Sequence, residues 1–170
     1  MESWDLFEEN RKALNRAIKR GEEKKQGEYH IVVSIWTVNS KGEILVTLRD
    51  PHKEVYPNTW ENTGGSVLVG ETSRQGAVRE LYEETGISAL EDELILLGTF
   101  KEESAFVDIY LLKRDIGLEE LTMQEGETVD AKWITIDTLW EWVEDHTLAL
   151  PIGERLNDVW NEFKKHLDGV

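Results

Sequence analysis

The chain has 170 residues, 39% of them hydrophobic and 32% charged, so it is long enough for one globular domain with a sizeable core. Seven tryptophans argue against disorder, no apolar run approaches the roughly 18 residues of a membrane span, and a net charge of −16 argues against non-specific nucleic-acid binding. Cysteine is absent, which excludes disulfides, zinc–thiolate sites and a cysteine nucleophile. The acidic first ten residues do not resemble a signal peptide, and we expect a cytoplasmic protein.

The first half of the chain predicts an N-terminal arm followed by two strands. Residues 1–27 have little apolar periodicity, so we expect an arm, such as a short hairpin, and not a separate domain. Residues 29–38 are rich in β-branched and aromatic side chains and predict a buried strand. A turn at 39–42 leads to a returning strand over 43–48, and a loop is expected over 49–63.

A helix is predicted over residues 72–84. Thr72 suits the N-cap, with Gln75 at the capping-box position, and Gly86 suits the residue that ends the helix. Val78, Leu81, Tyr82 and Thr85 lie on one side of this helix and are expected to face the core.

The remaining segments alternate between strand and helix patterns. Strands are expected near 94–100, 105–112 and 131–136, followed by a helix over 137–144. A last amphipathic helix carries an apolar stripe formed by Leu156, Val159, Trp160, Phe163 and Leu167. This order predicts an α/β fold with a mixed central sheet between helical layers, in a single domain over residues 1–170.

Three carboxylates share one sector of the predicted central helix. At about 100° per residue, Glu80, Glu83 and Glu84 fall within roughly 100° of one another. Each like-charge pair costs a few tenths of a kcal/mol, and the helix dipole disfavours anions near the C-terminus. Either this is a solvated acidic face or the carboxylates hold a hard cation, because Mg²⁺ and Mn²⁺ prefer oxygen ligands.

The residues before the helix favour the second interpretation, because glycines there allow close approach to a ligand. The fixed positions of the full Nudix signature are all present: Gly65, Glu71, Arg79-Glu80-Leu81, Glu83-Glu84, Gly86 and Ile87. The chain therefore resembles the Nudix family. This resemblance implies an α/β/α sandwich in which residues 65–87 form a loop–helix–loop, and an enzyme that hydrolyses a diphosphate linkage in a small molecule.

The resemblance also implies roles for individual residues. It implies that Mg²⁺ or Mn²⁺ is bound by Glu80, Glu83, Glu84 and the backbone carbonyl of Gly64. It gives Arg79 the task of orienting the carboxylates and Glu71 that of holding the loop to the helix, while Gly65 and Gly86 are structural positions. The expected substrate is a nucleoside diphosphate derivative.

The resemblance also implies one further acidic ligand from a later loop. Glu127 is the first choice, six residues before Trp133, with Glu125 and Glu103 as alternatives; an ordinary polar loop residue is the other interpretation. Either Glu80 or Glu127 is expected to accept the proton of the attacking water.

Candidate substrate contacts are Arg49 and Lys53, although plain surface charge explains both equally well. Trp60 and Phe106 suit either base stacking or the core, and His30 is expected to pack within its strand. The sequence leaves open whether the Trp-rich arm and the C-terminal helices bury their surface within one chain or in a homodimer.

Several segments resemble the Nudix branch related to isopentenyl-diphosphate isomerase, including residues 4–10, 27–30 and 60–65. Isomerases of that type place a catalytic cysteine near Gly64 or Gly65, and this chain has none. Isomerase-like activity and a non-catalytic nucleotide-binding module are therefore the two alternatives to a hydrolase.

Overall fold

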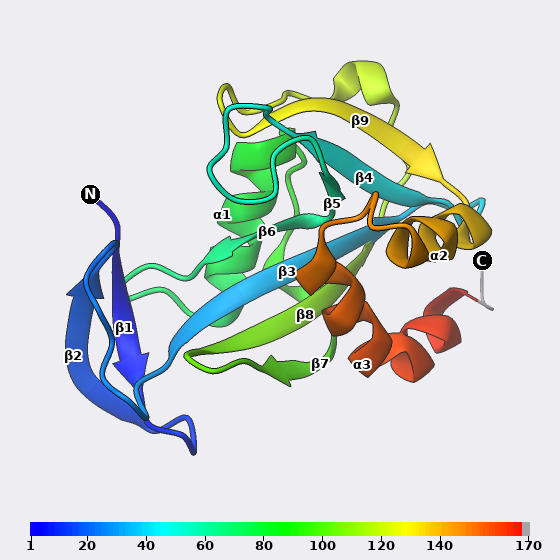
Figure 1. Ribbon diagram of the computed structural model, residues 1–170. Coiled ribbons are helices and arrows are strands. Elements are labelled where there is room, and N and C mark those ends of the chain that lie inside the picture. Colours follow the sequence, from blue (N-terminus) through cyan, green and yellow to red (C-terminus); the bar gives the residue numbers. More distant parts are fainter. Residues whose placement is uncertain (168–170) are drawn as a thin grey trace.

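A mixed sheet of seven strands forms the centre of the protein, and the computed structural model describes residues 1–167 (Figure 1). Its strands are β3 (His30–Val38), β4 (Ile44–Arg49), β5 (Trp60–Glu61), β6 (Thr63–Ser66), β7 (Ile95–Lys101), β8 (Ala105–Lys113) and β9 (Thr128–Ile134). Strands follow the order β5-β4-β3-β8-β7, with β6 also paired to β3 and β9 to β4. The β3–β8 pair is parallel and the other pairs are antiparallel, so the sheet is mixed as expected.

Helices cover both faces of the sheet. They are α1 (Ser73–Thr85), α2 (Ile136–Glu144) and α3 (Leu150–Leu167), with short 3₁₀ turns η1 (Glu91–Glu93) and η2 (Leu118–Glu120). Because side chains alternate along a strand, Val33 and Ile35 of β3 pack toward α1, whereas Trp36 packs toward α2 and α3. The predicted α/β/α sandwich is confirmed. No helix in the described part of the chain is long and apolar enough to cross a membrane.

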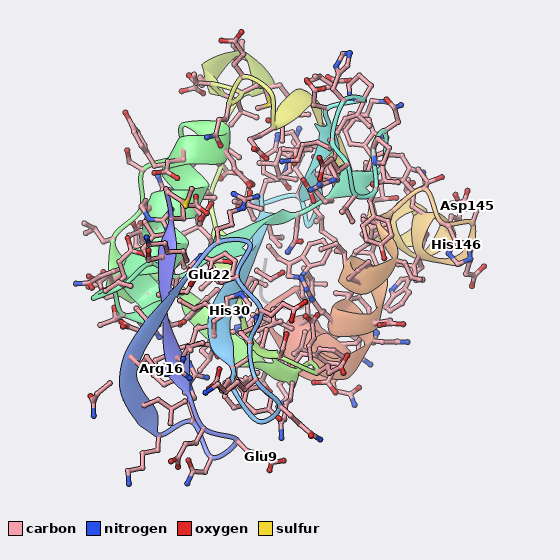
Figure 2. The ribbon with its side chains drawn as sticks, turned by 60° about the vertical axis from the view of Figure 1, so that its left-hand side comes forward. Glu9, Arg16, Glu22, His30, Asp145 and His146 are labelled. Carbon is pink, nitrogen blue, oxygen red and sulfur yellow. The ribbon has the colours of Figure 1, made fainter. Side chains whose placement is uncertain are left out.

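The N-terminal arm is a hairpin, as expected. β1 (Ser3–Phe7) and β2 (Ala13–Lys19) pair antiparallel and form a sheet of their own. Figure 1 shows this hairpin in blue at one end of the central sheet, with α2 and α3 toward the other end. Figure 2 shows Glu9 near the turn of this hairpin, and His30 farther from that turn, where β3 begins.

Two predicted boundaries are wrong. The segment 49–63 is not a loop throughout, because Trp60 and Glu61 form β5 against β4 and Thr63 begins β6. The last strand begins at Thr128, three residues before the predicted start, because a bulge lets Thr128 pair with Arg49. In both cases the pairing partner lies far away in the sequence, so no local pattern signals the strand.

Candidate active site

The signature segment folds into a strand end, a loop and a helix. The Thr72 hydroxyl accepts a hydrogen bond from the backbone N–H of Gln75, and the Gln75 side chain accepts one from Thr72, which completes the predicted capping box. Gly86 ends α1 with φ of 75°, a left-handed conformation that favours glycine. These caps fix where α1 begins and ends, and so fix the direction of its carboxylates.

The buried face of α1 differs from the predicted one. Leu81 and Thr85 face the core as expected, but Tyr82 is 60% exposed, so its predicted core position is wrong. The buried face is centred on Leu81, and Tyr82 lies about 100° away from it around the helix axis. Glu84 lies nearer to this face and is only 7% exposed.

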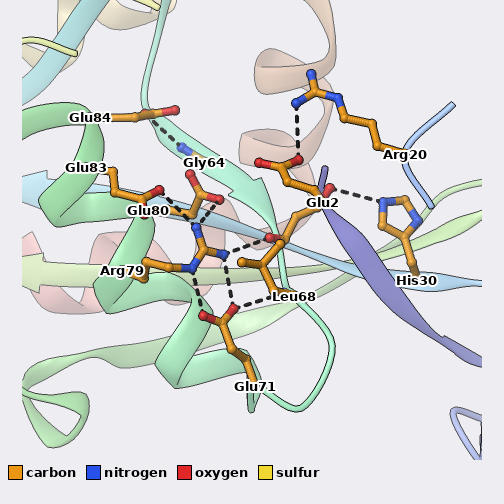
Figure 3. Close-up of polar contacts among 11 residues, drawn as sticks. Glu2, Arg20, His30, Gly64, Leu68, Glu71, Arg79, Glu80, Glu83 and Glu84 are labelled. Carbon is orange, nitrogen blue, oxygen red and sulfur yellow. Dashed lines mark hydrogen bonds and ion pairs between the residues drawn. The ribbon is translucent and has the colours of Figure 1, made fainter. Parts of the chain in front are cut away.

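Arg79 joins the loop to the helix (Figure 3). Its guanidinium donates to Glu71 at 2.7 and 3.0 Å, to Glu80 at 2.8 Å, to Glu83 at 3.0 Å and to the carbonyl of Ser66 at 3.0 Å. Burial alone would raise the pKa of Glu71, but the hydrogen bonds from Arg79 and a backbone N–H lower it. Arg79 thus holds three carboxylates in one arrangement.

Gly64 and Gly65 bring the backbone of β6 close to its neighbours. A Cβ at Gly65 would lie 2.3 Å from the Glu80 carboxylate, and one at Gly64 would lie 2.7 Å from the carbonyl oxygen of Val33 on β3. A side chain at either position would displace Glu80 or the strand. Because neither glycine has a side chain, the Glu80 carboxylate can lie directly against the strand.

Glu84 is the least compensated of the carboxylates. Its one hydrogen bond in the described structure comes from the Gly64 backbone N–H at a long 3.4 Å. Burial, together with the neighbouring carboxylates of Glu61, Glu80 and Glu127, raises its pKa well above the usual value. Burial likewise raises the pKa of Glu80, against the opposing effect of Arg79.

Glu61 is a carboxylate of this cluster that the sequence did not single out. It lies on β5, is largely buried, and accepts from Arg49 at 2.9 and 3.1 Å. Burial raises its pKa, and Arg49 opposes that rise. Its position just before the glycine pair was the only available signal, because Glu61 lies outside the signature.

A cavity of about 310 Å³ brings most of the predicted site residues together. Its lining consists of Glu2, Trp4, Arg20, Arg49, Lys53, Gly64, Gly65, Ser66, Glu80, Glu83, Glu84, Gln124 and Glu127. All the predicted ligands and both predicted substrate contacts are among them. Five of the lining residues were not predicted: Ser66, Gln124 and, from the N-terminal hairpin and its flanks, Glu2, Trp4 and Arg20.

The alternatives for the later acidic residue are separated by position. Glu127 lines the cavity and forms an ion pair with Lys53. Glu103 instead lines a wider hollow of about 890 Å³ beside Lys24, away from the signature, and Glu125 is exposed. Glu127 is therefore the one that shares the cavity with the signature carboxylates.

The remaining predicted contacts have structural partners. Arg49 bonds Glu61 and also donates to the backbone carbonyls of Val55 and Tyr56, in the loop that follows β4, at 2.9 to 3.2 Å. Trp60 and Phe106 are buried in the core, and His30 is packed at the start of β3, as expected. Neither Trp60 nor Phe106 therefore has an accessible ring face on which a base could stack.

The donor set of the cavity fits a divalent cation. As the side chains lie, no group of three His, Asp or Glu residues within 1–167 is arranged to hold an ion, and Arg79 keeps Glu80 engaged. Glu84, however, is a buried carboxylate beside other carboxylates, and its ionised form is costly unless a bound cation offsets the charge. Carboxylate oxygens from several residues, with a backbone carbonyl nearby, are the ligands that hard cations prefer.

Comparisons with known proteins found a matching family model, similar sequences and similar structures. A family model described as NUDIX domain matches residues 28–151. An uncharacterised Nudix hydrolase of Listeria monocytogenes is 39% identical over 145 residues, covering 82% of this chain and 83% of the relative. A crystal structure of a Deinococcus radiodurans protein aligns with a TM-score of 0.70 at 25% identity, covering 85% of this chain and 90% of that one. An isopentenyl-diphosphate Delta-isomerase of Corynebacterium diphtheriae is 36% identical over 67 residues, which cover 39% of this chain and 36% of the isomerase.

Proposed function

Because this chain belongs to the Nudix family and is a Nudix pyrophosphohydrolase, we propose that it cleaves the diphosphate linkage of a nucleoside diphosphate derivative with the help of Mg²⁺ or Mn²⁺. The observation that carries the proposal is Glu84, a buried carboxylate surrounded by other carboxylates. Local stability does not explain this arrangement, whereas a cation bound beside it does.

The residues that would hold the cation are those that line the cavity on α1 and beside it. They are Glu80, Glu83, Glu84, Glu127 and the carbonyl of Gly64. When bound, the cation would polarise the phosphoryl oxygens and acidify the attacking water. Arg79 keeps the carboxylates of Glu80 and Glu83 oriented, and Glu71 holds Arg79 in place.

Two carboxylates are candidates to accept the proton of the attacking water. Glu80 and Glu127 both line the cavity, and each is paired with one cationic side chain, Arg79 and Lys53 respectively. Lys53 is also a candidate phosphate contact, because a substrate phosphate could replace Glu127 as its partner. Arg49 is engaged by Glu61 and would act from the cavity wall.

The test is an activity screen of the purified chain with Mg²⁺, with Mn²⁺ and after chelation. The panel contains nucleoside di- and triphosphates, ADP-ribose, nucleotide sugars and isopentenyl diphosphate, with products separated by ion-exchange chromatography. Cleavage that requires a divalent cation supports the proposal and names the substrate class. Preparing Glu84→Gln in parallel controls for a contaminating enzyme.

Two other outcomes would overturn the proposal. Conversion of isopentenyl diphosphate to its allylic isomer would favour the isomerase, which the partial match to an isomerase makes worth including. Tight nucleotide binding without cleavage would favour a binding module. The proposal places the enzyme in the cytoplasm, which cell fractionation would check, and light scattering would decide between a monomer and a homodimer.

A further inference from the structure

The N-terminal hairpin contributes to the wall of the catalytic cavity. Glu2, Trp4 and Arg20, at the open end of the hairpin, line the same cavity as the signature carboxylates. The family match begins only at residue 28, so these side chains come from outside the family domain. They are therefore a part of the cavity wall that the matched range does not include.

The hairpin is fixed to the signature loop. The backbone N–H of Val69 donates to the carbonyl of Ser3 at 2.9 Å, and that of Gly70 donates to the Asp5 carboxylate at 2.9 Å. At the other end of the hairpin, Arg11 forms an ion pair with the buried Asp108. Contacts at both ends make the hairpin a fixed wall of the cavity, and they hold its residues in register with α1.

The three cations that line the cavity differ in how firmly they are engaged. Arg49 is paired with the buried Glu61, and the Lys53 side chain is also largely covered. Arg20 pairs with Glu2 at 3.1 Å, but the Arg20 side chain is 64% exposed and that of Glu2 is 44% exposed. An ion pair this exposed contributes little stability and is easily exchanged for another anion. Arg20 is thus the cavity cation most available to a substrate.

Building on the proposed function, we propose that Arg20 binds the terminal phosphate of the substrate and so selects compounds that end in a phosphate monoester. A terminal phosphate carries up to two negative charges near neutral pH, whereas each phosphate inside a diester linkage carries one. The planar guanidinium can donate two parallel hydrogen bonds to its oxygens. Nucleoside triphosphates fit this class, whereas ADP-ribose and nucleotide sugars, esterified at both ends, do not.

Glu2 acts as the anion that the phosphate displaces. Figure 3 shows the Glu2–Arg20 pair in the same close-up as Arg79 and Glu80, and the Glu2 charge is near enough to help raise the pKa of Glu80. Binding of a phosphate to Arg20 therefore has to overcome both the ion pair and the negative charge of Glu2. Removing that charge should strengthen phosphate binding, which is the opposite of the effect of removing Arg20.

The experiment compares kcat and KM for a nucleoside triphosphate and for ADP-ribose in four proteins: the native chain, Arg20→Ala, Glu2→Gln and Lys19→Ala. Lys19 is an exposed cation of the same hairpin that does not line the cavity, so it is the matched control. We expect Arg20→Ala to raise the triphosphate KM about tenfold with little change in kcat, and Glu2→Gln to lower it about twofold. The ADP-ribose KM and the Lys19→Ala constants should stay unchanged.

Calorimetric binding of imidodiphosphate, a non-hydrolysable diphosphate with two terminal phosphates, in Mg²⁺ separates this inference from the proposed function. Weaker binding to Arg20→Ala than to Lys19→Ala supports the role of Arg20 even if no compound is cleaved. Equal affinities and equal KM values for these two variants would overturn it while leaving hydrolysis intact. Unchanged melting temperatures would confirm that the variants are folded.

Discussion

Asp108 and Glu84 are both almost fully buried, with 3% and 7% of their surface exposed, but their surroundings differ in charge. Asp108, on β8, forms an ion pair with Arg11 and accepts hydrogen bonds from Ser73 at 2.5 Å and Thr99 at 2.7 Å. Burial alone would raise the pKa of Asp108, but these partners lower it. Glu84 has one long hydrogen bond and carboxylate neighbours, and its pKa is raised.

This is the difference that we expect between a structural carboxylate and a functional one. A buried charge that is matched by a cation and by hydrogen bonds ties parts of the fold together, and Asp108 joins the N-terminal hairpin to the start of α1. A buried charge among like charges lowers stability, and such sites persist where function requires them.

Glu84→Gln should lower kcat/KM about 10²- to 10³-fold in saturating Mg²⁺, because a neutral amide is a poor ligand for a hard cation. Steady-state kinetics on the best substrate of the panel would measure the loss. Glu144→Gln, which neutralises an exposed carboxylate at the end of α2, is the matched control and should keep full activity. Equal activity of the two variants would show that Glu84 has no catalytic role.

Asp108→Asn should cost about 3 kcal/mol of folding free energy, because it leaves Arg11 without its anion and disturbs the Ser73 and Thr99 hydrogen bonds. This expected loss is at the low end for a buried ion pair, because the Arg11 side chain is partly exposed. Urea unfolding would measure it, with Asp158→Asn on the exposed side of α3 as control. A cost no larger than that of the control would mean that Asp108 is not a structural anchor.

Features that depend on local sequence could be predicted. The limits of α1 follow from the Thr72 capping box and from the left-handed Gly86, both set by neighbours along the chain. The residues 29–38 carry an apolar run because β3 is buried on both faces. The signature spacing likewise indicated which carboxylates of α1 share the cavity.

Features that depend on distant pairing could not be predicted. Glu61 joins the carboxylate cluster only because two-residue β5 pairs with β4, and two residues are too few to show a period. The hairpin reaches the site through the bond between Asp5 and Gly70, which lie 65 residues apart. The burial of Glu84 likewise follows from how α1 packs on the sheet, which the helical period alone does not fix.

Without divalent cations, Glu84→Gln should stabilise the fold and raise the free energy of unfolding by about 2 kcal/mol, because it removes a buried charge and its repulsion from Glu61 and Glu80. In saturating Mg²⁺ the native chain should instead be more stable than Glu84→Gln. The reason is that Mg²⁺ binds the folded native chain and so stabilises it relative to the unfolded chain. Thermal unfolding with Mg²⁺ and with a chelator would measure both differences. A variant that is less stable than the native chain under both conditions would contradict the comparison.

His30 is a third buried ionisable group. Asp108 is charged and paired with a cation, Glu84 lacks such a partner, and burial favours the neutral form of His30. It stacks on Trp4 with ring centroids 4.5 Å apart, and its Nδ1 lies 2.7 Å from Lys24 Nζ and 3.2 Å from the Ser104 carbonyl oxygen. Its Nε2 lies 3.3 Å from the Ser66 hydroxyl. Burial, assisted by the Lys24 charge and opposed by Glu102, lowers its pKa from 6.5 to about 4.

Since the folded-state pKa of His30 is below the unfolded value, the unfolded chain binds more protons between pH 6.5 and about 4. The stability that neutral His30 contributes is therefore fully present above pH 6.5 and is lost as pH falls through this window. The expected loss is about 1–2 kcal/mol, less than the full linkage value because the Lys24 side chain can move away. His30→Phe keeps an aromatic ring against Trp4 but cannot titrate, so subtracting its unfolding free energies from those of the native chain cancels the carboxylates that titrate near pH 4. A difference that stays constant from pH 7 to pH 4 would mean that His30 takes up its proton at the same pH in the folded and the unfolded chain, and the hairpin would then be held beside the cavity by contacts that tolerate a buried charge.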